Sequence, residues 1–262
     1  MSVDLSIIIV SWNVRDALRD CLQSLENTKQ DISMEIILID NASEDGTREM
    51  LNKEFPHIDT ELSSVNEGLS KPWNRAARRA KGEYLLFLND DTVVFDHSLD
   101  MCVTYMRKNP MTAVLGCKLL NPDLSLQPSV RRLPTLFDQT MIALKIPHFV
   151  PQVINKYLCA SFDYEKTQHV EQVMGAFFMM PKSIFDKLDG FDESFFIWFE
   201  EVDFCKRVRN KDYNVTYFAD ASIIHQRGAS FKQIPTGKLQ KIFFRSLFHY
   251  FKKHHWFIKR IS

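Results

Sequence analysis

The sequence predicts an α/β domain that is built on a doubly wound, mostly parallel sheet. In the first half of the chain, continuous apolar runs alternate with segments in which apolar residues recur at helical spacing. The connections between these segments are short, and the apolar runs lack the alternation expected of a strand with one solvent-facing side. Strands that are covered by helices on both faces of a parallel sheet explain both features.

The first ninety residues contain a regular series of predicted strands and helices. The opening apolar run, residues 5–10, is typical of a strand that is buried on both faces. Ser43 is the expected N-cap of the second helix, because a serine hydroxyl can accept a hydrogen bond from the first helical turn. The expected elements are a strand over 5–10, a helix over 15–27, a strand over 34–40, a turn and helix over 41–55, a strand near 58–63, a helix over 69–80 and a strand over 84–88.

The second half of the chain is less regular. Five prolines interrupt residues 120–170, so we expect loops and short helices there, lying over one face of the sheet. Regular patterns return with a strand over 175–181, a helix within 194–213 and one or two closing strands over 214–226. The pattern from Thr236 onward predicts a helix.

Composition excludes several classes of protein. With 262 residues, 45% hydrophobic and 25% charged, the chain forms one large or two small globular domains and is neither fibrous nor disordered. Its five cysteines are scattered and form no C-x-x-C pair, which argues against a disulfide framework or a structural zinc and for a reducing compartment. The N-terminus is predicted to be a first strand rather than a signal peptide, and no apolar stretch is long enough to cross a membrane.

Polar residues follow three of the predicted strands directly. They are Ser11-Trp12-Asn13, Asp40-Asn41 and Asn89-Asp90-Asp91. Ligands of open α/β sheets bind beyond the carboxyl ends of parallel strands, so these clusters predict one shared site. Asp90 and Asp91 would repel each other in a plain surface turn, which is the alternative, whereas a bound cation would stabilise both.

The glycines narrow the choice of ligand. Neither G-x-G-x-x-G nor G-x-x-x-x-G-K-[ST] occurs, so a dinucleotide fingerprint and a P-loop are both unsupported. A divalent metal on an acidic strand end is the usual alternative for holding phosphates. Mg²⁺ typically takes one or two carboxylates and shares its remaining positions with substrate phosphates.

A set of ordered motifs carries a family resemblance. They are "SIIIVSWN", "ILIDNASEDGT", "NEGLSKPWNRAARRAKGEYLLFLNDDT", "MGAFFMM", "DGFDESFFIWFEEVDFCKRV" and "ASIIHQRGAS". In this order and spacing they resemble the inverting GT-A glycosyltransferases of family 2, most closely the bacterial rhamnosyltransferase-like branch. The resemblance covers roughly residues 4–230, and we expect a GT-A domain over residues 1–230 followed by a tail over 231–262.

The resemblance implies roles for the residues at the strand ends. Asn89-Asp90-Asp91 occupies the family's D-x-D position, with Asn89 in place of the first acid and Asp90 beside the donor. Asp91 would then be the main ligand of a Mg²⁺ or Mn²⁺ cofactor, and His225 would lie near the metal and the diphosphate. An ordinary rim histidine is the alternative for His225. The nucleoside of a nucleotide sugar would contact Ser11, Trp12, Asn13 and Asp40, with Asn66, Gly68 and Asn74 lining the same pocket.

The resemblance also implies a general base. The family usually has E-D-x-D where this chain has Glu200-Glu201-Val202-Asp203. Glu201 would remove the proton of the acceptor hydroxyl, and Glu200 would assist beside it. The alternative is that these acids form a solvated first turn of a helix, where negative charge is favourable.

The last residues differ from the rest in charge. Residues 226–262 contain no Asp or Glu but nine of the 33 basic residues, which leaves 24 basic against 33 acidic residues elsewhere. This pattern predicts a basic amphipathic helix that either packs on the domain or contacts an anionic membrane surface. No nucleic-acid-binding module accompanies the charge, so nucleic acid is not an expected partner. The residues expected on its basic face are Lys238, Lys241, Arg245, His249 and Lys252.

These features together predict an enzyme. It would transfer a sugar, with rhamnose as one candidate, from a nucleoside diphosphate sugar to a lipid-linked or cell-surface glycan acceptor. We expect it in the cytoplasm, at the inner face of the cytoplasmic membrane. Two alternatives are a sugar-phosphate nucleotidyltransferase, which needs a glycine-rich loop after the first strand that is missing here, and an inactive sugar-nucleotide-binding protein.

Overall fold

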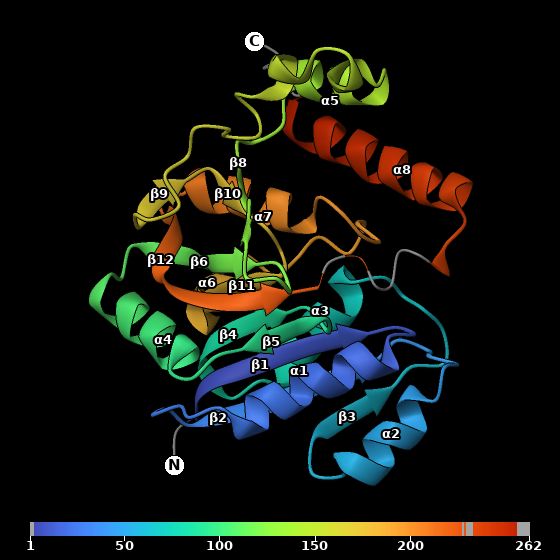
Figure 1. Ribbon diagram of the computed structural model, residues 1–262, viewed down its shortest axis with the longest axis vertical. Helices are drawn as coiled ribbons and strands as arrows, with labels where there is room; N and C mark the ends of the chain where they lie inside the picture. The colour runs from blue at the N-terminus through green and yellow to red at the C-terminus, as the bar shows by residue number, and fades with distance from the viewer. Residues whose placement is uncertain (1–2, 227, 229–232, 256–262) are drawn as a thin grey trace.

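A mixed sheet of ten strands forms the centre of the molecule in the computed structural model, which describes residues 3–226, 228 and 233–255 (Figure 1). The main strands follow the order β3-β2-β1-β4-β11-β6-β12-β5, with β7 paired to β6 and β9 to β12. β3, β2, β1 and β4 run parallel, as β6 and β12 do, whereas β11 runs antiparallel to both of its neighbours. The sheet is therefore largely parallel, as predicted.

The predicted strands correspond to β1, β2, β3, β4, β11 and β12, whereas β5 to β10 were not predicted. A separate two-stranded sheet joins β8 to β10. The bounds are β1 (Val3–Ser11), β2 (Met34–Asp40), β3 (Asp59–Leu62), β4 (Gly82–Leu88), β5 (Thr92–Val94), β6 (Thr112–Leu120), β7 (Leu126–Gln127), β8 (Val130–Arg131), β9 (Gln168–Val170), β10 (Gln172–Val173), β11 (Phe177–Pro181) and β12 (Asn214–His225).

Helices cover the sheet on both faces (Figure 1), and a third group of short helices lies at one end of the molecule. Their bounds are α1 (Arg15–Asn27), α2 (Thr47–Glu54), α3 (Ser70–Arg79), α4 (Ser98–Lys108), α5 (Leu136–Ala143), α6 (Lys182–Lys187), α7 (Glu200–Arg209) and α8 (Thr236–His255), with the 3₁₀ turns η1 (Ile146–His148) and η2 (Pro151–Ile154).

The core explains why the first strand has the continuous apolar run Ile7–Val10. Leu5, Ile7 and Ile9 pack on one face of the sheet, in a cluster with the buried side of α1 and α4. Ile8 and Val10 point to the other face, where they pack with α3, α6 and α7. Because both faces are covered by helices, the sheet is doubly wound as the sequence predicts.

The predicted N-cap of the second helix is wrong. α2 begins at Thr47 after Gly46, whose φ is 88°, and Ser43 lies in the preceding turn. The Ser43 hydroxyl instead accepts a hydrogen bond from the Asn13 backbone amide at 2.9 Å. Asp45 is closer to the helix and takes the capping bond, accepting from the Thr47 amide at 3.1 Å. The turn between β2 and α2 is thus tied to the turn after β1.

The C-terminal helix packs on the domain. Tyr250 and Phe251 of α8 are buried in a cluster with Phe195, Phe199 and Val202. His249, which we expected on the basic face, is half-buried and bonds to Asp192 at 2.9 Å. The four other residues of the predicted basic face are exposed, so the helix has one packed side and one cationic outer side.

Two predictions concern residues near the end of the chain that the structure does not describe. The predicted domain boundary at 230/231 and the last residues, 256–262, lie outside the described residues. None of the helices in the described part combines the length and the apolar character that crossing a bilayer requires.

Candidate active site

A cavity of about 600 Å³ opens at the carboxyl edge of the parallel strands. One wall comes from the ends of β1 and β4, with Ser11, Trp12 and residues 89–91. The other wall comes from the loop before α7 and the first turn of that helix, residues 196–202. This is the edge at which open α/β sheets bind ligands, and the volume is in the usual range for a small-molecule site.

Asp91 and His225 meet at the floor of this cavity. β12 pairs antiparallel with β5, so that His225 lies opposite Thr92 in the register. The pairing brings the imidazole Nε2 of His225 to 3.3 Å from Asp91 Oδ1. The Gln226 amide donates to the Asp91 carbonyl at 2.8 Å and fixes the two chains together. The two residues that the family resemblance assigned to the metal are thus brought together from positions 134 residues apart.

Gln127 determines which ring nitrogen of His225 carries the proton. Its side-chain nitrogen donates to Asn121 Oδ1 at 2.9 Å and to the His225 carbonyl at 3.2 Å. Its side-chain oxygen must therefore accept, and it lies 2.7 Å from His225 Nδ1. In the neutral imidazole, Nδ1 then carries the hydrogen and Nε2 presents a lone pair to the cavity. No motif or pattern predicted a role for Gln127, which lies in the proline-interrupted segment.

The donor set fits a divalent cation. Asp91 Oδ1 is buried and accepts no hydrogen bond from the described residues. This oxygen faces the Nε2 lone pair of His225. The side-chain amide nitrogen of Asn89 lies 3.2 Å from the same Nε2. A carboxylate oxygen and an imidazole nitrogen suit Mn²⁺, and carboxylate alone suits Mg²⁺. A histidine whose other ring nitrogen donates to an oxygen acceptor is the arrangement found at metal sites.

Asp90 is buried beside the same group. Burial, together with the smaller effect of the adjacent Asp91 charge, raises the pKa of its carboxyl to about 7. Only 7% of the residue is exposed, at the wall of the cavity. Asp90 and Asp91 are therefore both withdrawn from solvent. A surface turn does not describe them.

The residues expected to hold the nucleoside fall into two groups. Trp12, Asn66 and Gly68 line the cavity, as Ser11 does. Asn41, which belongs to the polar cluster after β2, supports this wall because its side-chain nitrogen donates to Asn66 Oδ1 at 3.1 Å and to the Gly68 carbonyl at 2.8 Å.

Asn13, Asp40 and Asn74 lie behind the wall and do not line the cavity. Asp40 is fully buried and pairs with Arg48 at 2.7 Å, and Asn13 Oδ1 accepts from the Glu44 amide at 2.7 Å. The Asn74 side chain bonds the Phe191 amide and carbonyl, each at 2.8 Å. In this structure the three side chains therefore position loops, rather than face a ligand.

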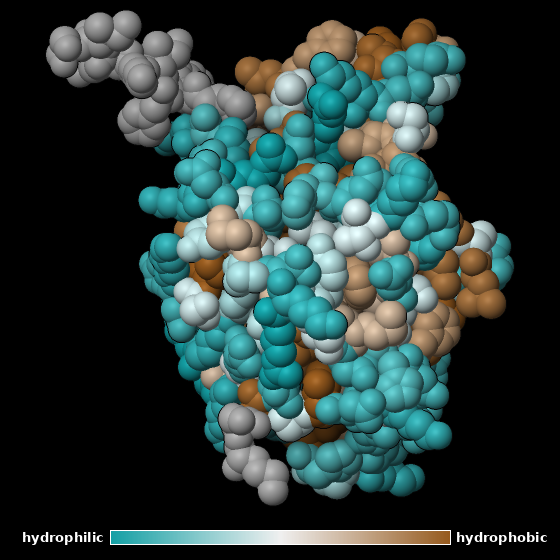
Figure 2. Space-filling model, turned by 90° about the vertical axis from the view of Figure 1, so that its left-hand side faces the viewer, coloured by the Kyte–Doolittle hydropathy of each residue, from teal (hydrophilic) through white to brown (hydrophobic). Residues whose placement is uncertain are grey.

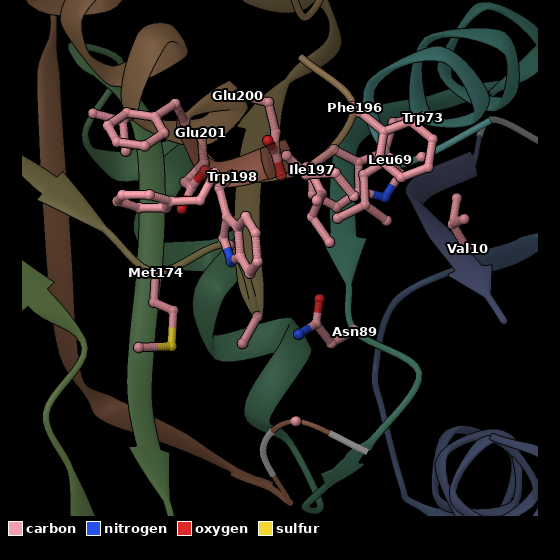
Figure 3. Close-up of a pocket in the computed structure, with 18 of the residues that line it drawn as sticks. Val10, Leu69, Trp73, Asn89, Met174, Phe196, Ile197, Trp198, Glu200 and Glu201 are labelled. Carbon is pink, nitrogen blue, oxygen red and sulfur yellow. The ribbon is translucent and has the colours of Figure 1, made fainter. Parts of the chain in front are cut away.

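The opposite wall presents two carboxylates. In Figure 3, Glu200 and Glu201 lie on the same side of the pocket as Trp198, with Asn89 on the opposite side. Trp198 and Phe199 precede them with φ of 66° and 73°, a conformation that costs bulky residues of order 1–3 kcal/mol each. This strained turn starts α7 so that its first two side chains enter the cavity.

The surroundings of these carboxylates disfavour their charge. Burial raises the pKa of Glu200 well above the ordinary value, and the neighbouring Glu201 adds to the effect. Burial likewise raises the pKa of Glu201. The Oε2 atoms of both residues are buried and have no hydrogen-bond partner among the described residues. A solvated first helical turn, the alternative to a functional site, is therefore excluded.

Asp203, the third acid of this helical turn, differs from Glu200 and Glu201 because its carboxylate is paired with cationic side chains. Its carboxylate accepts from Arg207 Nε at 2.7 Å and from His254 Nε2 at 2.7 Å, and Lys253 Nζ lies 2.8 Å away. Arg207 in turn donates to the carbonyls of Leu188 and Gly190, each at 2.7 Å. Asp203 thus joins α7 to α8 and to the loop before it, and does not face the cavity.

Unpaired polar atoms gather on this cavity. Buried groups in proteins are normally hydrogen-bonded, and exceptions call for an explanation. In the described part of the chain, six residues that line the cavity carry a buried side-chain atom with no hydrogen-bond partner. A ligand that supplies donors and positive charge would satisfy them. They are Ser11, Asp91, Ser129, Gln172, Glu200 and Glu201.

Comparison with known families identifies this arrangement. The chain matches the family described as Glycosyl transferase family 2 over residues 6–189, and the N-terminal domain of galactosyltransferase over residues 155–227. The first match covers well over half of the chain. The protein belongs to glycosyl transferase family 2.

A relative of known activity agrees with this membership. This family 2 chain is 25% identical over 251 residues to an N-acetylglucosaminyl-diphospho-decaprenol L-rhamnosyltransferase from Mycobacterium tuberculosis (strain CDC 1551 / Oshkosh). The match covers 90% of this chain and 80% of the relative. The protein is therefore a glycosyltransferase, and the nucleotidyltransferase alternative is set aside.

Solved structures establish the fold of this family 2 member. GalNAc-T7 with UDP, GalNAc and Mn²⁺ matches with a TM-score of 0.67 at 16% identity, over 86% of this chain and 44% of that one. Mannosyltransferase PcManGT from Pyrobaculum calidifontis, in complex with GDP-Man and Mn²⁺, matches with a TM-score of 0.63 at 15% identity, over 97% and 64%. The fold is that of the GT-A glycosyltransferases, as the resemblance implied.

Proposed function

We propose that this family 2 glycosyltransferase catalyses metal-dependent, inverting sugar transfer between the two walls of the cavity. The observation that supports this most directly is the pair of unpaired, buried carboxylate oxygens on opposite walls. Asp91 Oδ1 belongs to the strand-end wall and Glu201 Oε2 to the α7 wall. One suits a cation and a leaving diphosphate, and the other suits a proton from an incoming hydroxyl.

The strand-end wall would bind the donor. Asp91 and His225 would hold Mg²⁺ or Mn²⁺, with Asn89 and Asp90 beside them. When bound, the cation would neutralise negative charge on the leaving diphosphate. Trp12 and Asn66, with the Gly68 backbone between them, would form the nucleoside side of the pocket.

The α7 wall would activate the acceptor. Glu201 would take the proton of the acceptor hydroxyl as that oxygen bonds to the anomeric carbon and the bond to the diphosphate breaks. Its raised pKa brings it nearer to the pH at which it operates, which favours a general base. Since the acceptor and the leaving group lie on opposite sides, one displacement inverts the configuration. Glu200, which lines the same wall, would assist beside Glu201.

The acceptor we propose is lipid-linked, or a cell-surface glycan. The mycobacterial relative is named for an acceptor in which a sugar is joined to decaprenol through a diphosphate, and for rhamnose as the transferred sugar. An acceptor of this kind stays in a membrane, so the enzyme must reach the membrane surface. The outer side of α8, with Lys238, Lys241, Arg245 and Lys252, is suited to anionic lipid at the inner face of the cytoplasmic membrane.

A donor screen tests the proposal. The purified protein is incubated with a panel of nucleoside diphosphate sugars, with Mn²⁺, with Mg²⁺ or with excess chelator, and nucleoside diphosphate release is measured. We expect release from one or a few donors, only with metal, and accelerated by a polyprenyl diphosphate sugar. Nucleoside diphosphate release at the same rate with chelator as with metal would contradict metal dependence. A product with retained anomeric configuration would contradict a mechanism of one displacement.

A further inference from the structure

Large hydrophobic side chains are exposed close together at one end of the molecule. We define the apolar ledge as Leu136, Phe137, Leu144, Phe149 and Val150, which belong to α5 and to the segment after it. Their exposed fractions range from 49% for Val150 to 84% for Phe149. Five of the thirteen exposed large hydrophobics in the described part of the chain thus lie within fifteen consecutive residues.

The ledge has a one-sided charge. Residues 139–162 contain no Asp or Glu, whereas Lys145, His148 and Lys156 are exposed among them. The nearest preceding acid, Asp138, is engaged in the capping box of α5, where it accepts from the Thr135 hydroxyl at 2.6 Å. A surface that combines exposed apolar side chains with unopposed cations favours an anionic, apolar partner.

The ledge lies next to the outer side of α8. Figure 1 shows α5 and α8 at the same end of the molecule, away from the N-terminus. Leu133, just before α5, packs against the cluster that contains Tyr250 and Phe251 of α8. The outer side of α8 adds two more exposed aromatics, Phe244 at 50% and Phe248 at 57%. Figure 2 shows hydrophobic side chains gathered at this same end.

The ledge is also continuous with the active-site cavity. Gln139 of α5 and Tyr157, which follows η2, both line the cavity, as Glu201 does. The segment that exposes the ledge therefore also contributes to the wall of the cavity that contains Glu201.

We propose that the apolar ledge inserts into an anionic phospholipid bilayer, beside the cationic side of α8, and holds the cavity at the membrane surface. Leu144 and Phe149 enter the region between headgroups and acyl chains, while Lys145 and Lys156 contact lipid phosphates. This deepens the proposed function and rests on its lipid-linked acceptor for its purpose. A second copy of the chain fits less well, because it would bring the same cations face to face.

Vesicle sedimentation of the full chain tests the ledge. The vesicles are phosphatidylglycerol and phosphatidylcholine in equal parts, or phosphatidylcholine alone. Leu144→Ser/Phe149→Ser is compared with Leu124→Ser/Met111→Ser, whose native side chains are 61% and 51% exposed in other turns. We expect wild type and the control pair to bind the anionic vesicles alike, and the ledge pair to partition about 100-fold less, roughly tenfold per apolar side chain.

Thermal melting and donor hydrolysis establish that each variant is folded, and Leu144→Ala/Phe149→Ala repeats the measurement with a smaller change. Ledge variants that bind anionic vesicles as wild type does would overturn the proposal. So would a wild-type dimer that ledge variants turn into monomer without any vesicle binding, which would assign the ledge to a second copy. Transfer to a water-soluble acceptor separates the two proposals, since it depends on Glu201 and not on the ledge.

Discussion

His225 Nε2 lies 3.3 Å from Asp91 Oδ1, with a lone pair on each atom when the imidazole is neutral. The proton of the ring is held on the far side, between Nδ1 and Gln127. The Asn89 amide nitrogen lies 3.2 Å from Nε2, but Asp91 Oδ1 accepts no hydrogen bond from the described residues and so has no positive partner. The pairing of β12 with β5 therefore places two side chains where both could bind one cation.

Gln127 is predicted to be a positioning residue for this pair. Gln127→Leu removes the acceptor for Nδ1–H and frees the ring to adopt the other tautomer, so Mn²⁺ affinity should fall about 10- to 100-fold. The rate at saturating Mn²⁺ should recover most of its wild-type value. Gln127→Glu is the matched control, because it keeps the acceptor oxygen and should retain more affinity than the leucine. A Mn²⁺ titration that is the same for all three proteins would contradict this role.

Glu201 is predicted to be the general base. Glu201→Gln should lower the rate of transfer by two to four orders of magnitude, the usual contribution of a positioned base. Donor affinity should be nearly unchanged, because the base acts on the acceptor. Glu201→Asp restores the family's usual residue and is compared directly, since about 1 Å of reach separates the two side chains. Steady-state kinetics with donor and acceptor varied in turn measures both effects.

The pH profile supplies the matching control. Because burial raises the pKa of Glu201, the base is protonated at higher pH than an ordinary glutamate would be. The acid limb of kcat/KM should therefore lie above pH 4.5, and Glu201→Gln should abolish that limb. If Glu201→Gln transfers sugar at the wild-type rate, Glu200 takes the role of base, since Asp203 is occupied by Arg207 and α8.

Glu200 is predicted to lower stability at neutral and alkaline pH. Its pKa in the folded state is raised, so below the unfolded pKa both states are protonated and it has no effect. As the pH rises, the unfolded state ionises first, and the free energy of unfolding falls until the pH passes the folded pKa. Glu200→Gln should therefore melt at a higher temperature than wild type at pH 8, and the difference should close toward pH 4.5. An equal difference at both pH values would exclude this linkage.

Gly68 is predicted to fix the contact between the two walls. Its φ is 81°, and a Cβ there would lie 2.1 Å from the Phe196 carbonyl oxygen, which accepts from the Leu69 amide at 2.7 Å. Gly68→Ala should destabilise the fold by more than about 1 kcal/mol and weaken donor binding. Gly237→Ala is the control, since no atom lies within 4 Å of the added Cβ. Denaturant unfolding that shows equal stability for the two variants would contradict the structural reason.

The sequence predicted the sheet because burial on both faces leaves a local mark. Five of the six residues from Leu5 to Val10 are apolar, and side chains that point to both faces are included, as expected for a strand between two helix layers. The antiparallel direction of β11 left no such mark, because pairing is decided by contacts far along the chain. Its apolar run is the same in either direction.

Side-chain partners were harder to predict than strand ends. Asp91 follows a recognisable strand, so its place at the carboxyl edge could be predicted from the pattern alone. Gln127 and Arg48 could not, since nothing local marks a polar residue that bonds to one distant in the sequence. The N-cap prediction for Ser43 failed for the same reason, because its hydroxyl accepts a hydrogen bond from the Asn13 amide, thirty residues earlier.

The most direct test of the account is calorimetric titration of Mn²⁺ into wild type and Asp91→Asn, each with the nucleoside diphosphate of the preferred donor present. Asparagine keeps the shape of Asp91 but removes the charge that faces His225. We predict tight binding to wild type, loss of binding to Asp91→Asn by at least 100-fold and unchanged melting of the variant without metal. Mn²⁺ binding of equal affinity to both proteins would contradict the central claim that Asp91 holds the metal.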